Sequence, residues 1–240
     1  HAPITAWGTT VVTGRRQDGT AVQVNTVRSR VDLCTVPDSQ SEAALTLCQT
    51  LFGDRFQPRD GLLAISLSNL NPQNHLGIAL GNITRMERGE AWSQGQNVTP
   101  NVGRLLEQLD LERLAIAKAL GLDVKTIFQH FHLSFHVPVA SISEMNQQMH
   151  VQGNGGAGPA TADSRYVTED VPYGLQLTAV LGRLVGKPAT LHDAGINIFS
   201  AMYGRDFRTE NDLLNALKLD RFGLDELQQA ARTGLLTVMP

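Results

Sequence analysis

The sequence contains few cysteines and no long hydrophobic run. Two cysteines, Cys34 and Cys48, are too few for a disulfide scaffold, and their separation does not match the spacing of metal-binding cysteine pairs. The longest apolar stretch, residues 62–67, is far too short to cross a bilayer, and no signal peptide is visible. These absences favour a protein of the reducing cytoplasm without a membrane partner.

The sequence also lacks an excess of either charge. There are 20 Lys and Arg residues against 23 Asp and Glu residues, and the basic residues are scattered rather than arranged in a stripe. This distribution argues against a nucleic-acid partner, although it is compatible with a local pocket for an anion. Hydrophobic residues make up 42% of the 240 residues, which is enough for one large domain or for one domain plus a fragment.

The periodicity of the apolar residues changes near residue 37. Residues 9–36 contain β-branched and alternating segments that predict strands, and Pro37 ends them. From residue 38 onward the pattern is helical and predicts roughly eight to ten helices, with capping boxes at residues 39–42 and 141–144. The expected helices cover residues 43–52, 71–88, 100–120, 124–135, 142–150, 171–184 and 191–203, with short ones from about residues 209 and 224. The chain is therefore predicted to be mainly α.

Residues 71–75 (NPQNH) begin the helix that carries the first candidate functional residue. Asn71 is placed to cap the first N–H groups, and Pro72 suits the first helical position. His75 then lies in the first turn, near the positive end of the helix dipole. An imidazole at this position stays neutral unless a carboxylate is supplied from elsewhere in the chain.

A glycine-rich segment, residues 153–158 (GNGGAG), matches the pattern G-x-G-x-x-G of dinucleotide-binding proteins. That fingerprint has to follow a buried strand and open a helix, whose N-terminus receives the pyrophosphate. Here a predicted helix precedes the segment, and the residues that follow, beginning with Pro159, do not start a helix. We interpret the segment as a flexible loop that does not bind a nucleotide.

Three histidines, His130, His132 and His136, are close in sequence, and the last two are one helical turn apart. No nearby Asp, Glu or Cys completes a ligand set, and the phenylalanines among them favour packing. We therefore expect no metal. His150 and His192 have no recognisable partner in the sequence.

Residues 163–174 (DSRYVTEDVPYG) strengthen the case for His75. Glu169 and Asp170 lie just before a proline-initiated helix, where acidic residues stabilise a helix by about 0.3–1 kcal/mol. That effect explains both carboxylates but gives no reason for Arg165, which lies upstream of them. The segment thus offers a carboxylate for His75 and a cation for an anionic ligand.

The sequence resembles the C-terminal helical domain of the opine dehydrogenases, the octopine/nopaline dehydrogenase family. Two stretches carry the resemblance: residues 71–75 continuing through 82–89, and residues 165–175 with 181–184 downstream. Between them, residues 98–100 and 111–115 also fit the family pattern. The motif of residues 165–175 is the specific one, and the resemblance spans about residues 20–235.

The resemblance implies a mainly α fold class, a multi-helical C-terminal dehydrogenase domain similar to that of 6-phosphogluconate dehydrogenase, with a short β remnant at the N-terminus. Residues 1–37 would be remnant strands of a missing Rossmann domain that binds NAD(P), and residues 38–240 the helical substrate-binding and catalytic domain. The first residue is His1 rather than Met. We therefore expect a C-terminal fragment that is inactive alone.

The resemblance also implies the site. The family's catalytic histidine and its partner aspartate fall on His75 and Asp170, and the arginine that holds the keto-acid carboxylate falls on Arg165. Asn71 and Tyr166, which belong to the same two motifs, are further candidates for substrate binding.

Opine dehydrogenases join the amine of an amino acid to a 2-oxo acid and reduce the resulting imine with a reduced nicotinamide. The implied partners are these two substrates, NAD or NADP and the N-terminal Rossmann domain, and a homodimer is left open. Histidine suits the proton transfers of this reaction, a carboxylate fixes the ring's tautomer, and arginine grips a planar carboxylate.

Two other interpretations remain. One is a helical dimerisation or ligand-binding module without chemistry of its own. The other is a different dehydrogenase with a helical C-terminal domain, similar to 6-phosphogluconate dehydrogenase or ketopantoate reductase. Those enzymes commonly use a lysine base, and neither motif contains a lysine, so the opine dehydrogenase interpretation is favoured.

Overall fold

The computed structural model describes residues 2–235, without the side chains of residues 15, 25 and 26. The chain divides into two compact units. Unit 1 comprises residues 1–69 and 221–240, and unit 2 comprises residues 70–220. None of the helices in the described part of the chain is both long and apolar enough to span a membrane.

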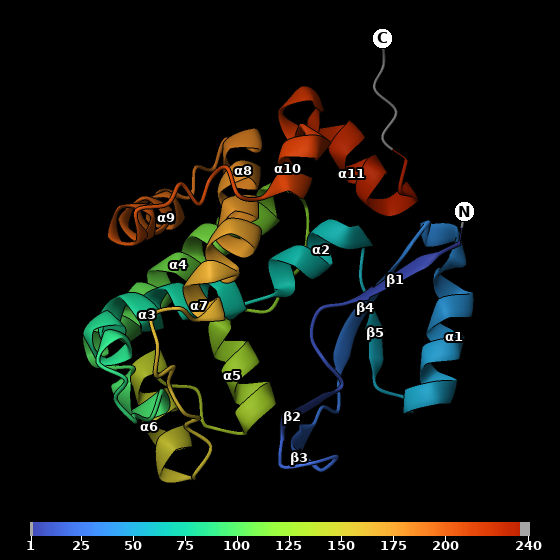
Figure 1. Cartoon of the computed structure of the whole chain (residues 1–240). Helices are drawn as coiled ribbons and strands as arrows, with labels where there is room; N and C mark the ends of the chain where they lie inside the picture. Colours follow the sequence, from blue (N-terminus) through green and yellow to red (C-terminus); the bar gives the residue numbers. More distant parts are fainter. Residues whose placement is uncertain (1, 236–240) are drawn as a thin grey trace. The chain divides into compact units, whose positions relative to one another are not determined.

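Unit 1 combines strands with three helices. Its elements are β1 (Ile4–Trp7), β2 (Val12–Arg16), β3 (Val22–Val27), β4 (Val31–Val36), α1 (Ser41–Phe52), β5 (Phe56–Pro58), α2 (Gly61–Ser68) and α11 (Leu224–Thr233). One sheet has the order β1-β4-β5, with β1 antiparallel and β5 parallel to β4, and α1 makes the crossover that a parallel pair requires. The strands β2 and β3 form a separate hairpin (Figure 1).

The strands predicted within residues 9–36 are present as β2, β3 and β4, although β2 begins at Val12. The strands β1 and β5 are additional. Every residue of β4 is buried, so its backbone N–H and C=O groups need partners on both edges, and β1 and β5 supply them. The sheet therefore includes residues beyond position 37, and its assignment to a Rossmann domain stays a prediction.

Unit 2 is helical. Its elements are α3 (Asn71–Glu87), α4 (Pro100–Ala119), α5 (Ile127–Phe135), α6 (Ile142–Val151), α7 (Arg165–Thr168), the π-helical segment η3 (Val171–Leu175), α8 (Gln176–Leu184), α9 (Thr190–Tyr203) and α10 (Asp212–Leu217). The mainly helical fold class is confirmed. The specific likeness to 6-phosphogluconate dehydrogenase stays a prediction.

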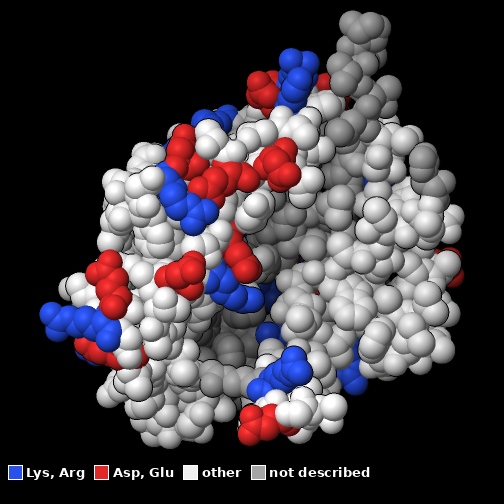
Figure 2. Space-filling model, in the orientation of Figure 1, with Lys and Arg blue, Asp and Glu red and all other residues white. Residues whose placement is uncertain are grey.

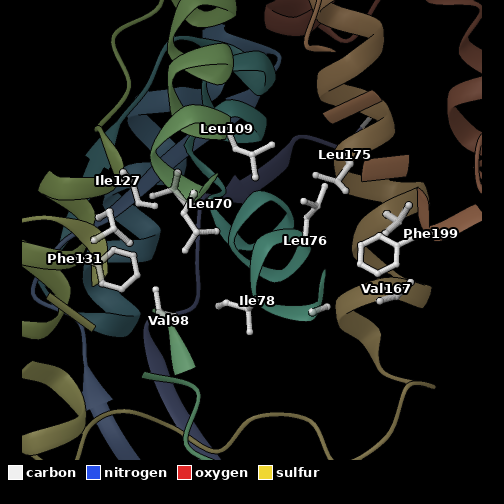
Figure 3. Close-up of a cluster of buried hydrophobic side chains, with 14 of the residues drawn as sticks. Leu70, Leu76, Ile78, Val98, Leu109, Ile127, Phe131, Val167, Leu175 and Phe199 are labelled. Atoms are coloured by element: carbon white, nitrogen blue, oxygen red, sulfur yellow. The ribbon is translucent and has the colours of Figure 1, made fainter. Parts of the chain in front are cut away.

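Helix α3 lies in the middle of the core of unit 2. In Figure 3 its side chains Leu76 and Ile78 lie between Phe131 on one side and Phe199 on the other. Leu76 and Ile78 are 1% and 2% exposed. Burial of such a side chain contributes about 1.5–3 kcal/mol, so packing fixes the position of α3 and of the residues on it.

The helix N-termini agree only in part with the sequence prediction. The capping box predicted at Ser141 is present at the start of α6. The box predicted before α1 is absent, because a 3-10 turn leads directly into the helix and Gln40 takes the cap position without a side-chain bond. In α3 the cap position belongs to Leu70, so Asn71 is the first helical residue rather than the cap. Helix α2 was not predicted because its continuous apolar run has no helical period.

Candidate active site

The side chains of His75 and Asp170 form a hydrogen-bonded pair within unit 2. Helix α3 carries His75, and Asp170 lies 95 residues later, directly before η3. Nδ1 of His75 is 2.6 Å from Oδ2 of Asp170, and the two side chains are 9% and 17% exposed. An ionised carboxylate only accepts hydrogen bonds, so the ring carries a proton on Nδ1 and leaves Nε2 for other interactions. The two residues singled out from the sequence therefore meet, and their catalytic role stays a prediction.

A glycine allows the two segments to approach each other. A Cβ atom on Gly174 would lie 2.2 Å from Cγ of Pro72, in the first turn of α3. Any side chain at position 174 would therefore push η3 away from α3. Val171 and Leu175 of η3 are fully buried, which holds the segment in place. The close contact explains why a glycine follows the proline-initiated turn of this motif.

Tyr166 covers one face of the His75 ring. The centroids of the two rings are 3.5 Å apart, and their planes differ by 10°. The hydroxyl of Tyr166 donates a hydrogen bond to Oε1 of Gln94, which lies in the connection between α3 and α4. The sequence analysis missed Gln94, because it belongs to no motif and reaches the site only through the tertiary structure.

Asn71 lies on the same helix as His75, and Arg165 lies on α7, five residues before Asp170. Arg165 is the first residue of α7, next to Tyr166, and its exposed guanidinium forms no ion pair with any residue that the structure describes. Its planar fork is therefore available for an external carboxylate. Asn71 is exposed and lies one helical turn before His75, so both project from the same face of α3.

The glycine-rich segment, residues 153–158, does not have the conformation of a dinucleotide-binding turn. Helix α6 precedes it, and no helix begins before α7. Its carbonyl groups accept hydrogen bonds from the backbone of the α3–α4 connection: Gln94 N–H donates to Gly156 at 3.0 Å, and Gly95 N–H donates to Gly155 at 2.8 Å. The interpretation as a loop is confirmed, and its attachment to Gln94 is a contact that the sequence did not predict.

The histidines at residues 130–136 have separate surroundings. Nδ1 of His132 lies 2.9 Å from the carbonyl oxygen of Val137, His136 ends α5 in the left-handed conformation, and His130 contacts neighbouring phenylalanine rings. Among residues 2–235, no three His, Cys, Asp or Glu side chains are grouped so that they could hold a metal ion.

His192 and His150, for which no partner is recognisable in the sequence, each have a side-chain partner in the structure. Nδ1 of His192 lies 2.8 Å from Oε2 of Glu112, and its side chain is 1% exposed. Burial raises the pKa of Glu112, but the hydrogen bonds from His192 and from the start of α9 outweigh it and hold that pKa below its ordinary value. Nδ1 of His150 lies 2.8 Å from the hydroxyl of Ser93. Sequence separations of 80 and 57 residues conceal both partners.

The remaining surface of the described residues has mixed charge and a cavity. On the face shown in Figure 2, acidic and basic side chains of the described residues are interspersed. A cavity of about 380 Å³ lies where α4 ends, lined by residues that include Lys118 and Asp123. None of the five residues singled out as site candidates lines it.

The family described as "NAD/NADP octopine/nopaline dehydrogenase, alpha-helical domain" matches residues 58–203. The chain belongs to this family. It is 34% identical over 203 residues to the opine dehydrogenase of Arthrobacter sp. (strain 1C), an alignment that covers 82% of this chain and 55% of that protein. The chain thus spans about half the length of this relative.

Solved structures of octopine dehydrogenase share the fold. One with NADH and L-arginine has a TM-score of 0.75 at 17% identity and covers 95% of this chain and 65% of that chain. One with NADH and agmatine has a TM-score of 0.75 at 16% identity, with the same coverage. One with NADH and pyruvate has a TM-score of 0.72 at 17% identity and covers 95% of this chain and 64% of that chain.

Proposed function

We propose that this chain supplies the substrate-binding and catalytic residues of an opine dehydrogenase-like oxidoreductase. The reaction condenses the amine of an amino acid with a 2-oxo acid and reduces the imine with NADH or NADPH. The observation that carries the proposal is the 2.6 Å contact between His75 and Asp170, which joins the two motifs that carry the family resemblance. The family match and the structures named for complexes with L-arginine and with pyruvate support the two substrate classes.

His75 is proposed as the proton donor and acceptor. Condensation releases water, so a proton has to reach the hydroxyl group that leaves the former carbonyl carbon. With Nδ1 held by Asp170, Nε2 is the atom that exchanges this proton. The Asp170 carboxylate fixes the tautomer and stabilises the imidazolium against the positive end of the α3 dipole. General acid–base catalysis of this kind contributes about 10²–10⁴-fold to a rate.

Arg165 is proposed to hold the carboxylate of the 2-oxo acid. A guanidinium can form two parallel hydrogen bonds to one carboxylate, which would fix the orientation of the carbon that is reduced. Asn71 is proposed as a further substrate-binding residue because it lies one turn before His75 on α3, whereas Tyr166, which the sequence predicts to bind substrate, lies beside His75 on α7. The roles of all three residues depend on the assignment of His75.

We assign NAD or NADP mainly to an N-terminal Rossmann domain, of which residues 1–37 would be the last strands, and the catalytic chemistry to residues 38–240. The glycine-rich residues 153–158 do not fit the nucleotide, because the loop is hydrogen-bonded to residues 94–95 and opens no helix. The residues of this chain therefore bind substrate and move protons. A cytoplasmic location and a homodimer stay predictions.

The test is a substrate screen on the full-length protein. Pairs of amino acids and 2-oxo acids are supplied with NADH or NADPH, and nicotinamide oxidation is followed together with the mass of the product. We expect oxidation that requires both substrates and yields a secondary amine with two carboxylates. A protein that binds an amino acid but turns over no pair would instead support the ligand-binding module.

A further inference from the structure

We infer that Tyr166 is a positioning residue for His75, and that the glycine-rich loop at residues 153–158 supports it through Gln94. The inference rests on the proposed function, because it concerns the residue that moves the proton. It adds a role for the tyrosine and for the loop that neither motif suggests.

The stack between Tyr166 and His75 differs in geometry from eight other ring contacts in the described part of the chain. Its rings lie almost directly above one another, with centroids 3.5 Å apart and planes 10° apart. Those eight ring pairs have planes 43–86° apart. Stacked rings at this distance are in van der Waals contact over most of one face. Tyr166 therefore resists tilting of the His75 ring away from Asp170.

The tyrosine is held in turn by the glycine-rich loop. Its hydroxyl donates to Gln94, whose own backbone N–H donates to the carbonyl of Gly156 at 3.0 Å. The loop packs closely here: a Cβ on Gly158 would lie 2.2 Å from Cε2 of Trp92. The indole Nε1–H of Trp92 also donates to the backbone beyond the loop, at Pro159, over 3.0 Å. A chain of contacts thus runs from the loop through Gln94 and Tyr166 to His75.

These contacts also distinguish positioning from substrate binding. The hydroxyl of Tyr166 already donates to Gln94, and one face of its ring already covers His75. If the Tyr166 hydroxyl bound substrate, its removal would raise KM. If the Tyr166 ring positions His75, removal of the ring would lower kcat, and phenylalanine, which keeps the ring, would preserve most of kcat.

The kinetic test uses variants of the full-length enzyme. We expect Tyr166→Leu to lower kcat about tenfold while KM for either substrate stays within about twofold. Tyr166→Phe keeps the ring and removes the hydroxyl that donates to Gln94, so kcat should fall no more than about threefold. The matched control is Tyr203→Phe, which removes a hydroxyl that donates to the Ala162 carbonyl at 2.7 Å and should leave kcat unchanged. An unchanged kcat in Tyr166→Leu, or a change of KM alone in Tyr166→Phe, would overturn the inference.

A second measurement does not depend on activity, so it separates this inference from the proposed function. In the full-length protein labelled with ¹⁵N-histidine, the signals of His75 are assigned by their loss in His75→Gln. We expect one fixed Nδ1–H state in the wild type and in Tyr166→Phe, and averaged ring signals in Tyr166→Leu. If thermal unfolding shows that Tyr166→Leu does not fold, Gln94→Ala replaces it, with an expected loss of kcat of about two- to threefold. A fixed ring in Tyr166→Leu, or full kcat in Gln94→Ala, would contradict the positioning role.

Discussion

Unit 2 contains two histidine–carboxylate pairs that look alike at first. His75 pairs with Asp170 at 2.6 Å, and His192 pairs with Glu112 at 2.8 Å. In both, Nδ1 meets a carboxylate oxygen supplied by a distant part of the chain. The pairs differ in what else each partner contacts, and this difference indicates which of them is available for chemistry.

The carboxylate of Glu112 accepts several hydrogen bonds from the protein. Its two oxygens accept hydrogen bonds from the hydroxyl of Thr190, the backbone N–H groups of Leu191 and His192, and the His192 ring, so the carboxylate caps the start of α9. Asp170, in contrast, accepts a single hydrogen bond within the described part of the chain, from His75. The Glu112 carboxylate therefore links α4 to the start of α9. The Asp170 carboxylate binds only the His75 ring among the described residues, and the side chain of His75 is 9% exposed, compared with 1% for His192.

The largest difference between the pairs is expected when each histidine is removed. His75→Ala in the full-length enzyme should lower kcat by about 10²–10⁴-fold and leave the affinity for the nicotinamide unchanged, because only the proton donor is lost. His192→Ala should keep kcat within about threefold and lower the free energy of unfolding, because it leaves Glu112 without its partner. Steady-state kinetics and thermal unfolding of both variants would measure this contrast. A His75→Ala enzyme with normal turnover would refute the catalytic assignment.

The second prediction tests the close contact between Gly174 and Pro72, which brings the segments of Asp170 and His75 together. Gly174→Ala places a Cβ where Pro72 already lies, so we expect a loss of about 1–3 kcal/mol in the free energy of unfolding. Asp170 lies directly before η3, so a shift of η3 should also disturb the His75–Asp170 pair and lower kcat. The control is Gly223→Ala, where the new Cβ would make an ordinary contact 3.5 Å from Oε2 of Glu226. Equal stability of the two variants, measured by denaturant unfolding, would contradict the explanation of the glycine.

The third prediction concerns the pH dependence that distinguishes the structural pair. The pKa of Glu112 is lowered in the folded protein, so its carboxylate adds stability above its ordinary value of 4.5, and this stability is lost as the pH falls through the folded value. Glu112→Gln should therefore cost about 1–2 kcal/mol at neutral pH, and the difference from the wild type should shrink below about pH 4.5. Asp170→Asn, the matching change in the other pair, should instead cause a large loss of kcat. Denaturant unfolding at a series of pH values measures this difference in the free energy of unfolding. A difference that grows as the pH falls would contradict the prediction.

The smallest expected effect concerns Arg165, which precedes Tyr166 at the start of α7. Arg165→Lys keeps the charge but loses the two-pronged geometry, so KM for the 2-oxo acid should rise about tenfold while KM for the amine changes by less than about twofold. Arg183→Lys is the matched control near the other pair, since that guanidinium is already bound to Asp193 at 3.1 Å. Its kinetics should match the wild type. Equal changes in both Michaelis constants for Arg165→Lys would indicate a structural arginine.

The sequence predicted most helices because their signals are local. Proline at the start, glycine at the end and a capping box at Ser141 lie within a few residues of the helices they delimit. The strands β1 and β5 and the helix α2 escaped prediction, because short or uniformly apolar segments carry no period. The strands β1 and β5 form because β4 needs partners on both edges, and α2 forms because most of its apolar side chains are buried.

The site was predictable where residues belong to a motif. His75 and Asp170 were identified through two motifs, and the structure adds the distance between them. Gln94 and the partner of His192 were not predicted, since a hydrogen bond between residues 72 or 80 positions apart leaves no local pattern. The glycine-rich segment was predicted to be a loop, but its contact with Gln94 came only from the structure.

The order of residues along the chain thus determined that this protein is mainly helical, where most of its helices begin and end, and which histidine has a motif around it. Those properties depend on interactions within a few residues of each other. Tertiary packing alone decided that Glu112 is the carboxylate that meets His192, that a tyrosine lies over His75, and that the glycine-rich loop contacts the segment holding that tyrosine. Such contacts depend on how buried side chains fit together across long sequence separations, and a single sequence does not encode that fit in any local pattern.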